Sequence, residues 1–283
     1  MMNQKLKILL IAYQFPPYHN VGSLRIGKFA KFLISKGHTV TVLCADRILM
    51  PKTLDTEIDP NHIIRTNWLN VNFVPQLLFG GRERVISEGY QTKSSLIKKL
   101  GYLYRLLTNF PDERVGWLPF AIKAGNNILA KRKIHLIYAS SPTPVSLIAA
   151  DRLSRKWKVP WVAEYRDPWA DTVHYDFPEW RRKLEKHIEK RVLSNVSGIV
   201  TISDPLAEEY RIVFKKPTIT SMNGFSLEDV QKIQRQPDQS PDLQIVYTGT
   251  IHMDIVHLEP LFQAISMMGS EGKNIQIHIY TRY

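Results

Sequence analysis

The segment VAEYRDPWAD, residues 162–171, places chemically capable side chains directly after an apolar run. These side chains are Glu164, Tyr165, Arg166, Asp167 and Trp169. Pro168 cannot donate a further ladder hydrogen bond, so a strand has to end here. Two carboxylates, a guanidinium and two aromatic rings at the tip of a buried strand make this segment a candidate for a ligand site.

A second candidate is the loop YQFPPYHNVGSLR, residues 13–25, which also follows an apolar run. Gly22 has no side chain and lets the backbone approach a ligand closely. Ser23 begins a helix-like segment whose free N–H groups favour an anion. The loop is not a GxGxxG fingerprint, and no acidic residue occupies the ribose position of a dinucleotide site. A site of the NAD type is therefore disfavoured.

The elements that must position these segments alternate between strand-like and helix-like runs. Residues 7–12 are nearly all apolar, as expected of a parallel strand covered on both faces. The other expected strands are 38–45, 134–140, 160–165, 198–203 and 218–224. Helices are expected between them, including 145–157 and about 178–193. This rhythm predicts an α/β fold with a parallel, Rossmann-like sheet, in which ligands bind at the carboxyl ends of the strands.

The alternation is interrupted between Asn67 and Lys133. Within this range, SSLIKKLGYLYRLLTNF (94–110) predicts a helix with a wide apolar stripe flanked by basic residues. This helix either packs in the ordinary way or lies on an anionic membrane surface. The sequence leaves both interpretations open.

The net charge of +12 is concentrated in two stretches. Residues 93–133 hold nine Lys and Arg against two Asp and Glu, and residues 181–191 hold six against two. Such basic faces can meet an anionic membrane surface, phosphorylated substrates or nucleic acid. For 181–191 the alternative is a solvated helix face, with Glu185 and Glu189 at salt-bridge spacing. No zinc, RRM or helix-turn-helix signature is present, so nucleic acid is not an expected partner.

The composition, 44% hydrophobic and 23% charged residues, is typical of a globular protein, and 283 residues suffice for about two domains. The single cysteine, Cys44, allows no disulfide framework and fits a cytoplasmic location. We expect the N-terminus to form a strand rather than a signal peptide. No apolar run approaches the ~20 residues of a membrane-spanning helix. No spacing of His, Cys or Asp resembles a metal site, and no cofactor is expected.

The predicted domain organisation is a first domain over 1–225, a polar linker over 226–242 and the start of a second domain over 243–283. The last range predicts only a strand, a helix and a strand. A piece of about 40 residues cannot enclose its own core. We therefore expect an incomplete second domain, either truncated or completed by something else.

Six segments in order resemble family-4 glycosyltransferases with the GT-B fold. They are AYQFPPYHNVGSLR, KFLISKGHTVTVLCA, IYASSPTPVSLIAA, PWVAEYRDPWAD, SMNGF and IVYTGTI. The fourth is similar to the RDPW motif of a bacterial subgroup. The resemblance extends from Lys7 to Tyr280, and it implies two Rossmann-like domains around a cleft. The first domain would mainly hold the acceptor and the second the nucleotide-sugar donor, with retention of anomeric configuration and no metal.

Residue by residue, the resemblance implies that Gly22 and Ser23 approach the donor diphosphate and that Arg25 steadies the loop or an anion. Arg166 and Asp167 would be catalytic, with Asp167 orienting or deprotonating the acceptor hydroxyl. Trp169 would stack on a sugar face. Asn223 and Gly224 would form the turn between the domains, and Gly249 and Thr250 a phosphate-facing loop. The positions expected to line the substrates are Tyr13, Gly22, Ser23, Arg25, Glu164, Trp169, Asn223, Gly224, Gly249 and Thr250.

Structural alternatives exist for these positions. Asp167 would then cap a turn or pair with Arg166, Arg25 would be a surface charge, and Trp169 would pack. The glycines would then serve turn geometry only. These alternatives stay open at the level of sequence.

The sequence also departs from the family pattern. GTIHMDIVHLEPL lacks the basic residue expected near the diphosphate, and NGFSLED lacks the expected aspartate. The acidic E-x7-E region of the donor site would lie beyond Tyr283. We therefore expect a glycosyltransferase of bacterial surface-glycan synthesis, at the inner face of the membrane, that lacks its donor half. Its expected partners are a nucleotide-sugar and a glycan or lipid-linked acceptor. The alternative is a non-catalytic acceptor-side subunit that needs a separate donor-binding partner.

Overall fold

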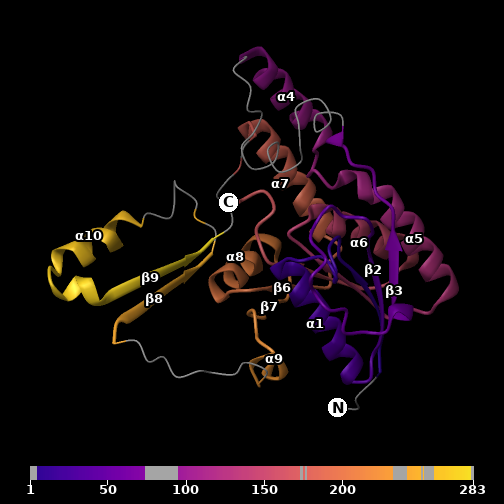
Figure 1. The fold of residues 1–283 in the computed structure, drawn as a ribbon. Helices are drawn as coiled ribbons and strands as arrows, with labels where there is room; N and C mark the ends of the chain where they lie inside the picture. The colour runs from indigo at the N-terminus through magenta and orange to yellow at the C-terminus, as the bar shows by residue number, and fades with distance from the viewer. Residues whose placement is uncertain are drawn as a thin grey trace. The chain divides into compact units, whose positions relative to one another are not determined.

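The computed structural model describes residues 5–73, 95–172, 175, 177–231, 241–249, 251 and 258–281. By its internal contacts the chain divides into two compact units, Met1–Asn223 and Gly224–Tyr283. Figure 1 shows their elements along the chain. The predicted domain ranges 1–225 and 243–283 remain predictions. Within the range expected to be a linker, the structure has a short helix, α9 (Leu227–Gln231).

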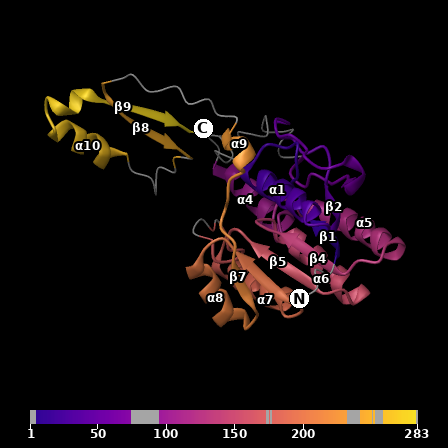
Figure 2. The same cartoon turned by 90° about the horizontal axis from the view of Figure 1, so that it is seen from below.

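The first unit contains a seven-stranded sheet in which every neighbouring pair of strands is parallel. Its strands are β1 (Lys7–Ile11), β2 (Thr39–Ala45), β3 (Ile63–Thr66), β4 (Leu136–Ser140), β5 (Trp161–Tyr165), β6 (Gly198–Thr201) and β7 (Thr218–Thr220). The order across the sheet is β3-β2-β1-β4-β5-β6-β7, and Figure 2 labels β2, β1, β4, β5 and β7 in this order. The predicted α/β class with a parallel sheet is confirmed.

This strand order has a switch point between β1 and β4. From β1 the chain proceeds to β2 and β3 on one side, and from β4 it proceeds to β5, β6 and β7 on the other. Ile11, the last residue of β1, pairs with Leu43 on one side and Ala139 on the other. The connections that leave β1 and β4 therefore diverge, and in sheets of this kind ligands bind in the crevice at such a switch point.

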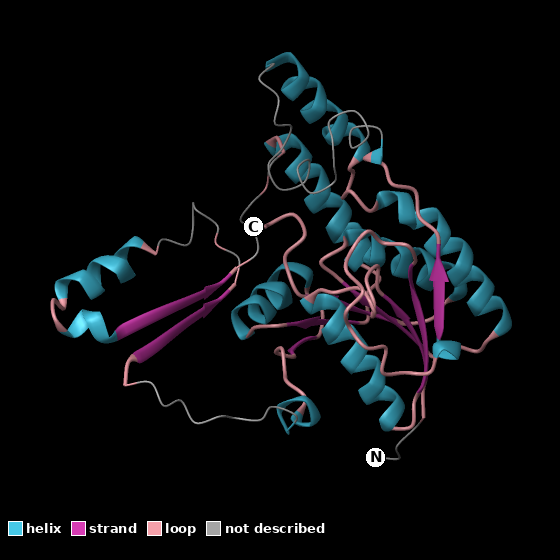
Figure 3. Ribbon diagram, in the orientation of Figure 1, coloured by secondary structure: helices cyan, strands magenta, loops and turns pink. Residues whose placement is uncertain are grey.

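Helices connect most of the strands (Figure 3). They are α1 (Val21–Ser35), α4 (Ser95–Thr108), α5 (Leu118–Lys131), α6 (Pro144–Trp157), α7 (Glu179–Leu193) and α8 (Asp204–Phe214), with short 3-10 helices at Pro60–His62 and Val115–Trp117. The sequence predicted neither β3 nor α5. Strand β3 is short and half-buried, and α5 begins at a proline-containing turn with a buried Gly125 that weakens its helical pattern.

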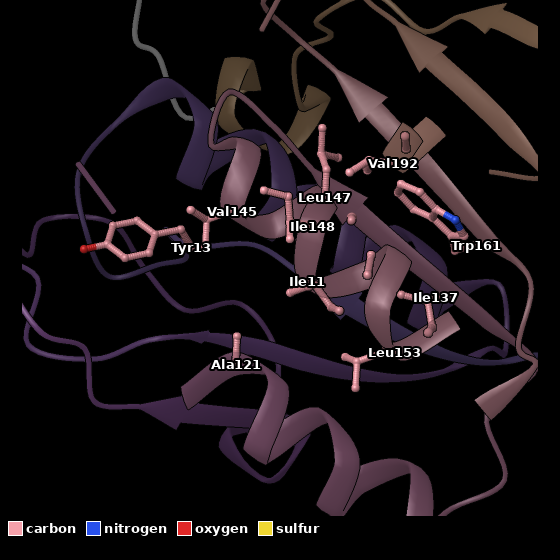
Figure 4. Close-up of a cluster of buried hydrophobic side chains, with 14 of the residues drawn as sticks. Ile11, Tyr13, Ala121, Ile137, Val145, Leu147, Ile148, Leu153, Trp161 and Val192 are labelled. Carbon is pink, nitrogen blue, oxygen red and sulfur yellow. The ribbon is translucent and has the colours of Figure 1, made fainter. Parts of the chain in front are cut away.

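The core lies on both faces of the sheet because side chains alternate along each strand. Leu9 and Ile11 face one cluster, which includes Trp161 and residues of α5 and α6 (Figure 4). Ile8 and Leu10 face a second cluster with α1. Burial on both faces explains why these strands are continuous apolar runs.

Helix α7 contains residues 181–191, for which one interpretation was a solvated basic face. The structure instead buries part of this helix. Arg181 is fully buried and donates from Nε to Oε1 of Glu185 at 2.8 Å. Its other guanidinium nitrogens donate to backbone carbonyls at the end of α4, and its Cζ atom lies 3.6 Å from the ring centroid of Phe177. Glu189 is buried as well. One face of this charged helix therefore packs inward and fixes α4.

The second unit has a parallel pair, β8 (Leu243–Thr248) and β9 (Ile275–Tyr280), with α10 (Glu259–Met267) and a 3-10 helix at Glu271–Asn274. None of its described residues is buried. Leu243, Val246 and Phe262 are among its exposed apolar side chains. A two-stranded sheet without a buried face is marginal at best.

Candidate active site

The predicted site segments meet at the switch point of the first unit. Gly22 lies in the first turn of α1, which follows β1, and Arg166 directly follows β5. A Cβ atom placed on Gly22 would lie 2.7 Å from Cζ of Arg166 and still closer to its terminal nitrogen Nη1. The guanidinium therefore fills the space that any other residue at position 22 would need for its side chain.

Backbone N–H groups at the start of α1 point to an anion site at the same place. Asn20 caps the helix, and its Oδ1 accepts from the N–H of Ser23 at 2.6 Å. The N–H groups of Val21 and Gly22 make no hydrogen bond within the described part of the chain. Two free donors, the positive end of a helix and a guanidinium together favour a negatively charged group.

Arg166 is held by the connection that leaves β4. Its Nε donates to the carbonyl of Ser141 at 2.5 Å, while the N–H of Ser141 donates to the carbonyl of Glu164 at 2.9 Å. Burial lowers the pKa of Arg166, and the nearby carboxylates of Glu164 and Asp167 oppose this effect. The guanidinium remains a cation, with its terminal nitrogens directed at the first turn of α1.

Glu164 and Arg25 form a buried ion pair beside this cation. Oε1 of Glu164 accepts from Nε of Arg25 at 3.0 Å, and Oε2 accepts from the hydroxyl of Ser140 at 2.5 Å. Glu164 is 2% exposed. Burial and this carboxylate raise the pKa of Tyr138 well above its usual range. Both carboxylate oxygens of Glu164 are thus bonded within the first unit, to Arg25 and Ser140.

The other guanidinium N–H groups of Arg25 donate to residues 221–223, which follow β7. Arg25 donates to the carbonyls of Ser221 and Met222 at 2.9 and 3.0 Å and to Oδ1 of Asn223 at 3.0 Å. Its side chain is 14% exposed. The alternative in which Arg25 is a free surface charge is therefore wrong, because the residue is mostly buried and its guanidinium is bonded to Glu164 and to residues 221–223.

The remaining predicted residues of the first unit are divided between surface and core. Asp167 is exposed and directly follows Arg166 in the sequence. Trp169 and Tyr13 are 5% and 3% exposed and belong to the same core cluster. Figure 4 shows Tyr13 within this cluster. Both rings pack, as the structural alternative for Trp169 expects, and a role in stacking on a sugar stays a prediction.

Three buried hydroxyl groups near the crevice make no hydrogen bond in the described chain. They belong to Ser23 in α1, Ser141 after β4 and Ser146 in the first turn of α6. Buried polar groups are normally satisfied, so orphaned hydroxyls around a crevice indicate contact with water or a ligand. The sequence analysis did not name Ser141 or Ser146. The available signal was the segment ASSPTP, where serines and prolines follow a buried strand.

The predicted residues beyond Asn223 belong to the second unit. Gly224 is its first residue, and the N–H of Gly249 donates to the carbonyl of Tyr280 at 3.0 Å. Thr250 lies outside the described residues. Roles for these three positions stay predictions.

The described residues show neither a metal-binding cluster nor a membrane-spanning helix. No group of three or more His, Cys, Asp or Glu side chains gathers there in a way that could hold a metal ion. None of the described helices has both the length and the apolar character that crossing a membrane requires.

Comparison with known proteins provides independent information. Residues 23–216, more than half of the chain, match the model of a family described as a glycosyl transferase 4-like domain. Among proteins with curated descriptions, none matches this sequence significantly.

Solved structures with a similar fold include an Arabidopsis thaliana starch synthase IV catalytic domain bound to ADP and acarbose. It is 12% identical with a TM-score of 0.52, and the match covers 99% of this chain and 75% of that one. A Listeria monocytogenes protein assigned as a UDP-N-acetylglucosamine 2-epimerase is 12% identical with a TM-score of 0.53, and the match covers 99% of this chain but only 64% of that one. At these identities the likeness shows the fold, and the expected GT-B type is confirmed.

Proposed function

The chain belongs to the family of glycosyl transferase 4-like domains, and from this premise we propose that it transfers a sugar from a nucleotide-sugar donor to an acceptor hydroxyl. The observation that carries the proposal is the position of Arg166, whose guanidinium lies against the first turn of α1 at the switch point. Leaving-group charge on a diphosphate would be stabilised there by this cation and by free backbone N–H groups.

In this proposal the bond between the sugar C1 and the diphosphate oxygen breaks, and a bond between C1 and the acceptor oxygen forms with retention of configuration. The diphosphate leaves with the electron pair, beside Arg166. Asp167, which is exposed, orients the acceptor hydroxyl and takes its proton. The hydroxyls of Ser141 and Ser146 supply further donors at the same edge. For the second unit, taken by itself, we propose that Gly249 and Thr250 form a phosphate-facing loop.

The acceptor that we propose is a glycan or lipid-linked intermediate at the inner face of a bacterial membrane. Helix α4 supports this proposal. Leu100, Leu103 and Leu107 are 57%, 48% and 70% exposed, and their spacing puts them on one face of the helix. Lys99 is exposed in the same helix. On α7, which holds α4 through Arg181, Trp180 is 58% exposed. Exposed apolar residues beside lysines suit the surface of an anionic membrane.

The second candidate is a non-catalytic acceptor-side module that obtains its donor-binding half from another polypeptide. The exposed apolar side chains of β8, β9 and α10 favour it, because this unit buries no described residue. In this case the first unit would still bind the acceptor, and sugar transfer would require the partner.

The experiment that tests the proposal is sugar transfer followed by mass spectrometry. The purified chain is incubated with UDP-, ADP- and GDP-sugars and a polyprenyl-phosphate-linked acceptor extract. Product that disappears in Arg166→Met, but persists in the surface variant Arg152→Met, supports the enzyme. Transfer only after addition of a second protein supports the module. Undiminished transfer by Arg166→Met contradicts the role of this guanidinium.

A further inference from the structure

A cavity lined by several charged residues lies at the amino edge of the sheet, at the opposite ends of the strands from the first turn of α1. It measures about 340 Å³ and is lined by Lys7, Thr39, Thr41, Lys131, Arg132, Lys133 and Ile134. Lys7 and Thr39 are the first residues of β1 and β2, and Lys131 is the last residue of α5. This volume falls within the ~300–1,000 Å³ typical of small-molecule sites.

The strand register places three polar side chains, Lys7, Thr39 and Thr41, at positions that would otherwise extend the core. Lys7 pairs with Thr39, and Leu9 pairs with Thr41. Since side chains alternate, Lys7 and Thr41 lie on the face of the sheet where Leu9 packs with α5 and α6. Thr41 is 3% exposed, and its Oγ1 accepts from Nη1 of Arg132 at 3.1 Å. A buried hydroxyl thus fixes the guanidinium in the wall of the cavity.

The cavity carries four cations and no carboxylate in its lining. Lys7, Lys131, Arg132 and Lys133 make no ion pair with any carboxylate that the structure describes. The sequence explains this, because residues 1–45 and 114–150 contain no Asp or Glu. One cation in the last turn is enough to complement the dipole of α5. All four residues are exposed, so water and salt screen their mutual repulsion, and an anion with several charges would bind most favourably among them at low salt.

We propose that this cavity binds a ligand through its phosphate groups, at a site separate from the glycosyl-transfer crevice. The planar guanidinium of Arg132 would bind two phosphate oxygens at once, Lys131 and Lys133 would neutralise further charge, and the Thr39 hydroxyl would donate a hydrogen bond. The phosphates would belong either to a free oligophosphate or to a phospholipid headgroup, and both sources present the same chemistry to these residues.

Calorimetric titration of the full chain with pyrophosphate, at low salt, tests the free ligand. We expect saturable binding that persists in Arg166→Met, since that cation lies at the other edge. Lys131→Met with Lys133→Met should weaken binding by at least about tenfold, because two charge-assisted contacts are lost. Thr41→Val, which keeps the shape of the core, should weaken it severalfold by releasing Arg132. The matched control, Lys123→Met with Arg152→Met, removes two exposed charges from α5 and α6 and should change binding by less than about twofold.

Flotation with vesicles of phosphatidylglycerol, compared with phosphatidylcholine, tests the lipid source. Binding of phosphatidylglycerol that requires Lys131 and Lys133 but not Lys123 and Arg152, without pyrophosphate binding, assigns the site to a headgroup. Thermal unfolding establishes that each variant is folded. Thr41→Val tests the same site without removing a charge. If neither probe depends on Lys131 and Lys133, or if the control pair has the same effect, the proposal is wrong.

Discussion

At position 22, the lack of a side chain gives the guanidinium of Arg166 its place against α1. Replacement of a helical glycine by alanine normally favours the helix by up to about 1 kcal/mol. Here the added methyl would displace the flexible end of Arg166 from the free N–H groups. Helix stability therefore favours alanine at position 22, whereas the proposed activity requires glycine.

We predict that Gly22→Ala leaves the free energy of unfolding within about 1 kcal/mol of the wild type but lowers sugar transfer by at least about tenfold. Urea unfolding and product formation are measured on the same preparation. Val21→Ala, at the exposed neighbouring position, is the control and should change neither quantity strongly. Full transfer activity in Gly22→Ala would show that the position of Arg166 is unimportant.

The ion pair between Arg25 and Glu164 supports a second prediction. Arg25→Met leaves the Glu164 carboxylate buried and without its cation, so unfolding should become easier by about 3–5 kcal/mol. Adding Glu164→Gln removes the stranded charge and should recover part of this loss. The measurement is the midpoint and slope of urea unfolding. Equal stability of the single and double variants would mean that the buried charge does not cause the loss.

Helix α7 carries a buried carboxyl that makes stability depend on pH. Glu189 lies buried on α7, and burial raises its pKa to about 7, against the opposing effect of the Tyr165 hydroxyl. Burial likewise raises the pKa of Asp112, before α5, to about 6. Both groups bind a proton more tightly in the folded chain than in the unfolded one. Their stabilising contribution is complete below the usual carboxyl pKa and is lost as the pH rises through the folded values.

We therefore predict that the chain loses stability between pH 4.5 and pH 7, and that Glu189→Gln reduces this loss by about 3 kcal/mol. Denaturant unfolding at a series of pH values checks the slope. Part of the slope should remain in the variant because of Asp112. Glu179→Gln, an exposed position on the same helix, should leave the slope unchanged. An identical slope in Glu189→Gln would contradict the elevated pKa.

Helix α4 supports the membrane part of the proposed function. Leu103→Gln with Leu107→Gln should lower flotation with anionic vesicles severalfold, because the exposed apolar face is lost. Stability should change little, since both side chains are exposed. Ile212→Gln replaces an exposed apolar residue on α8 and is the matched control. Flotation that is unaffected by the α4 pair, or lowered equally by Ile212→Gln, would remove this support.

For the whole molecule, the two units differ in how much apolar surface they bury. Residues 1–223 contain the described core on both faces of a seven-stranded sheet. We predict that this fragment unfolds cooperatively and with the same midpoint as the longer chain, whereas residues 224–283 alone show no cooperative transition. Circular dichroism during thermal unfolding checks both fragments. A cooperative transition in the 224–283 fragment would contradict the prediction.

Most of the first sheet was predictable because both-sided burial makes each strand an apolar run with turn residues at its ends. The strands starting at Lys7, Thr39 and Trp161 were expected within two residues of their observed bounds. Strand β3 and helix α5 were missed because short, half-buried or glycine-containing segments carry weak periodicity.

Only those parts of the candidate site that short sequence segments mark were predictable. The segments around Gly22 and Arg166 were chosen because loops after parallel strands share one edge of a sheet. The partners of Arg25 lie 139 and about 197 residues away, so no local pattern could distinguish a buried ion pair from a surface charge. Ser141 and Ser146 were missed for a similar reason, since their lack of partners is a property of the packed structure.

The bonds from Arg25 to Ser221, Met222 and Asn223 have a mechanical consequence. They fasten the end of the first unit to α1 and, through Glu164, to β5. Residues 221–223 are therefore held to the body of the first unit by one side chain, and loss of the Arg25 guanidinium would release this whole connection at once.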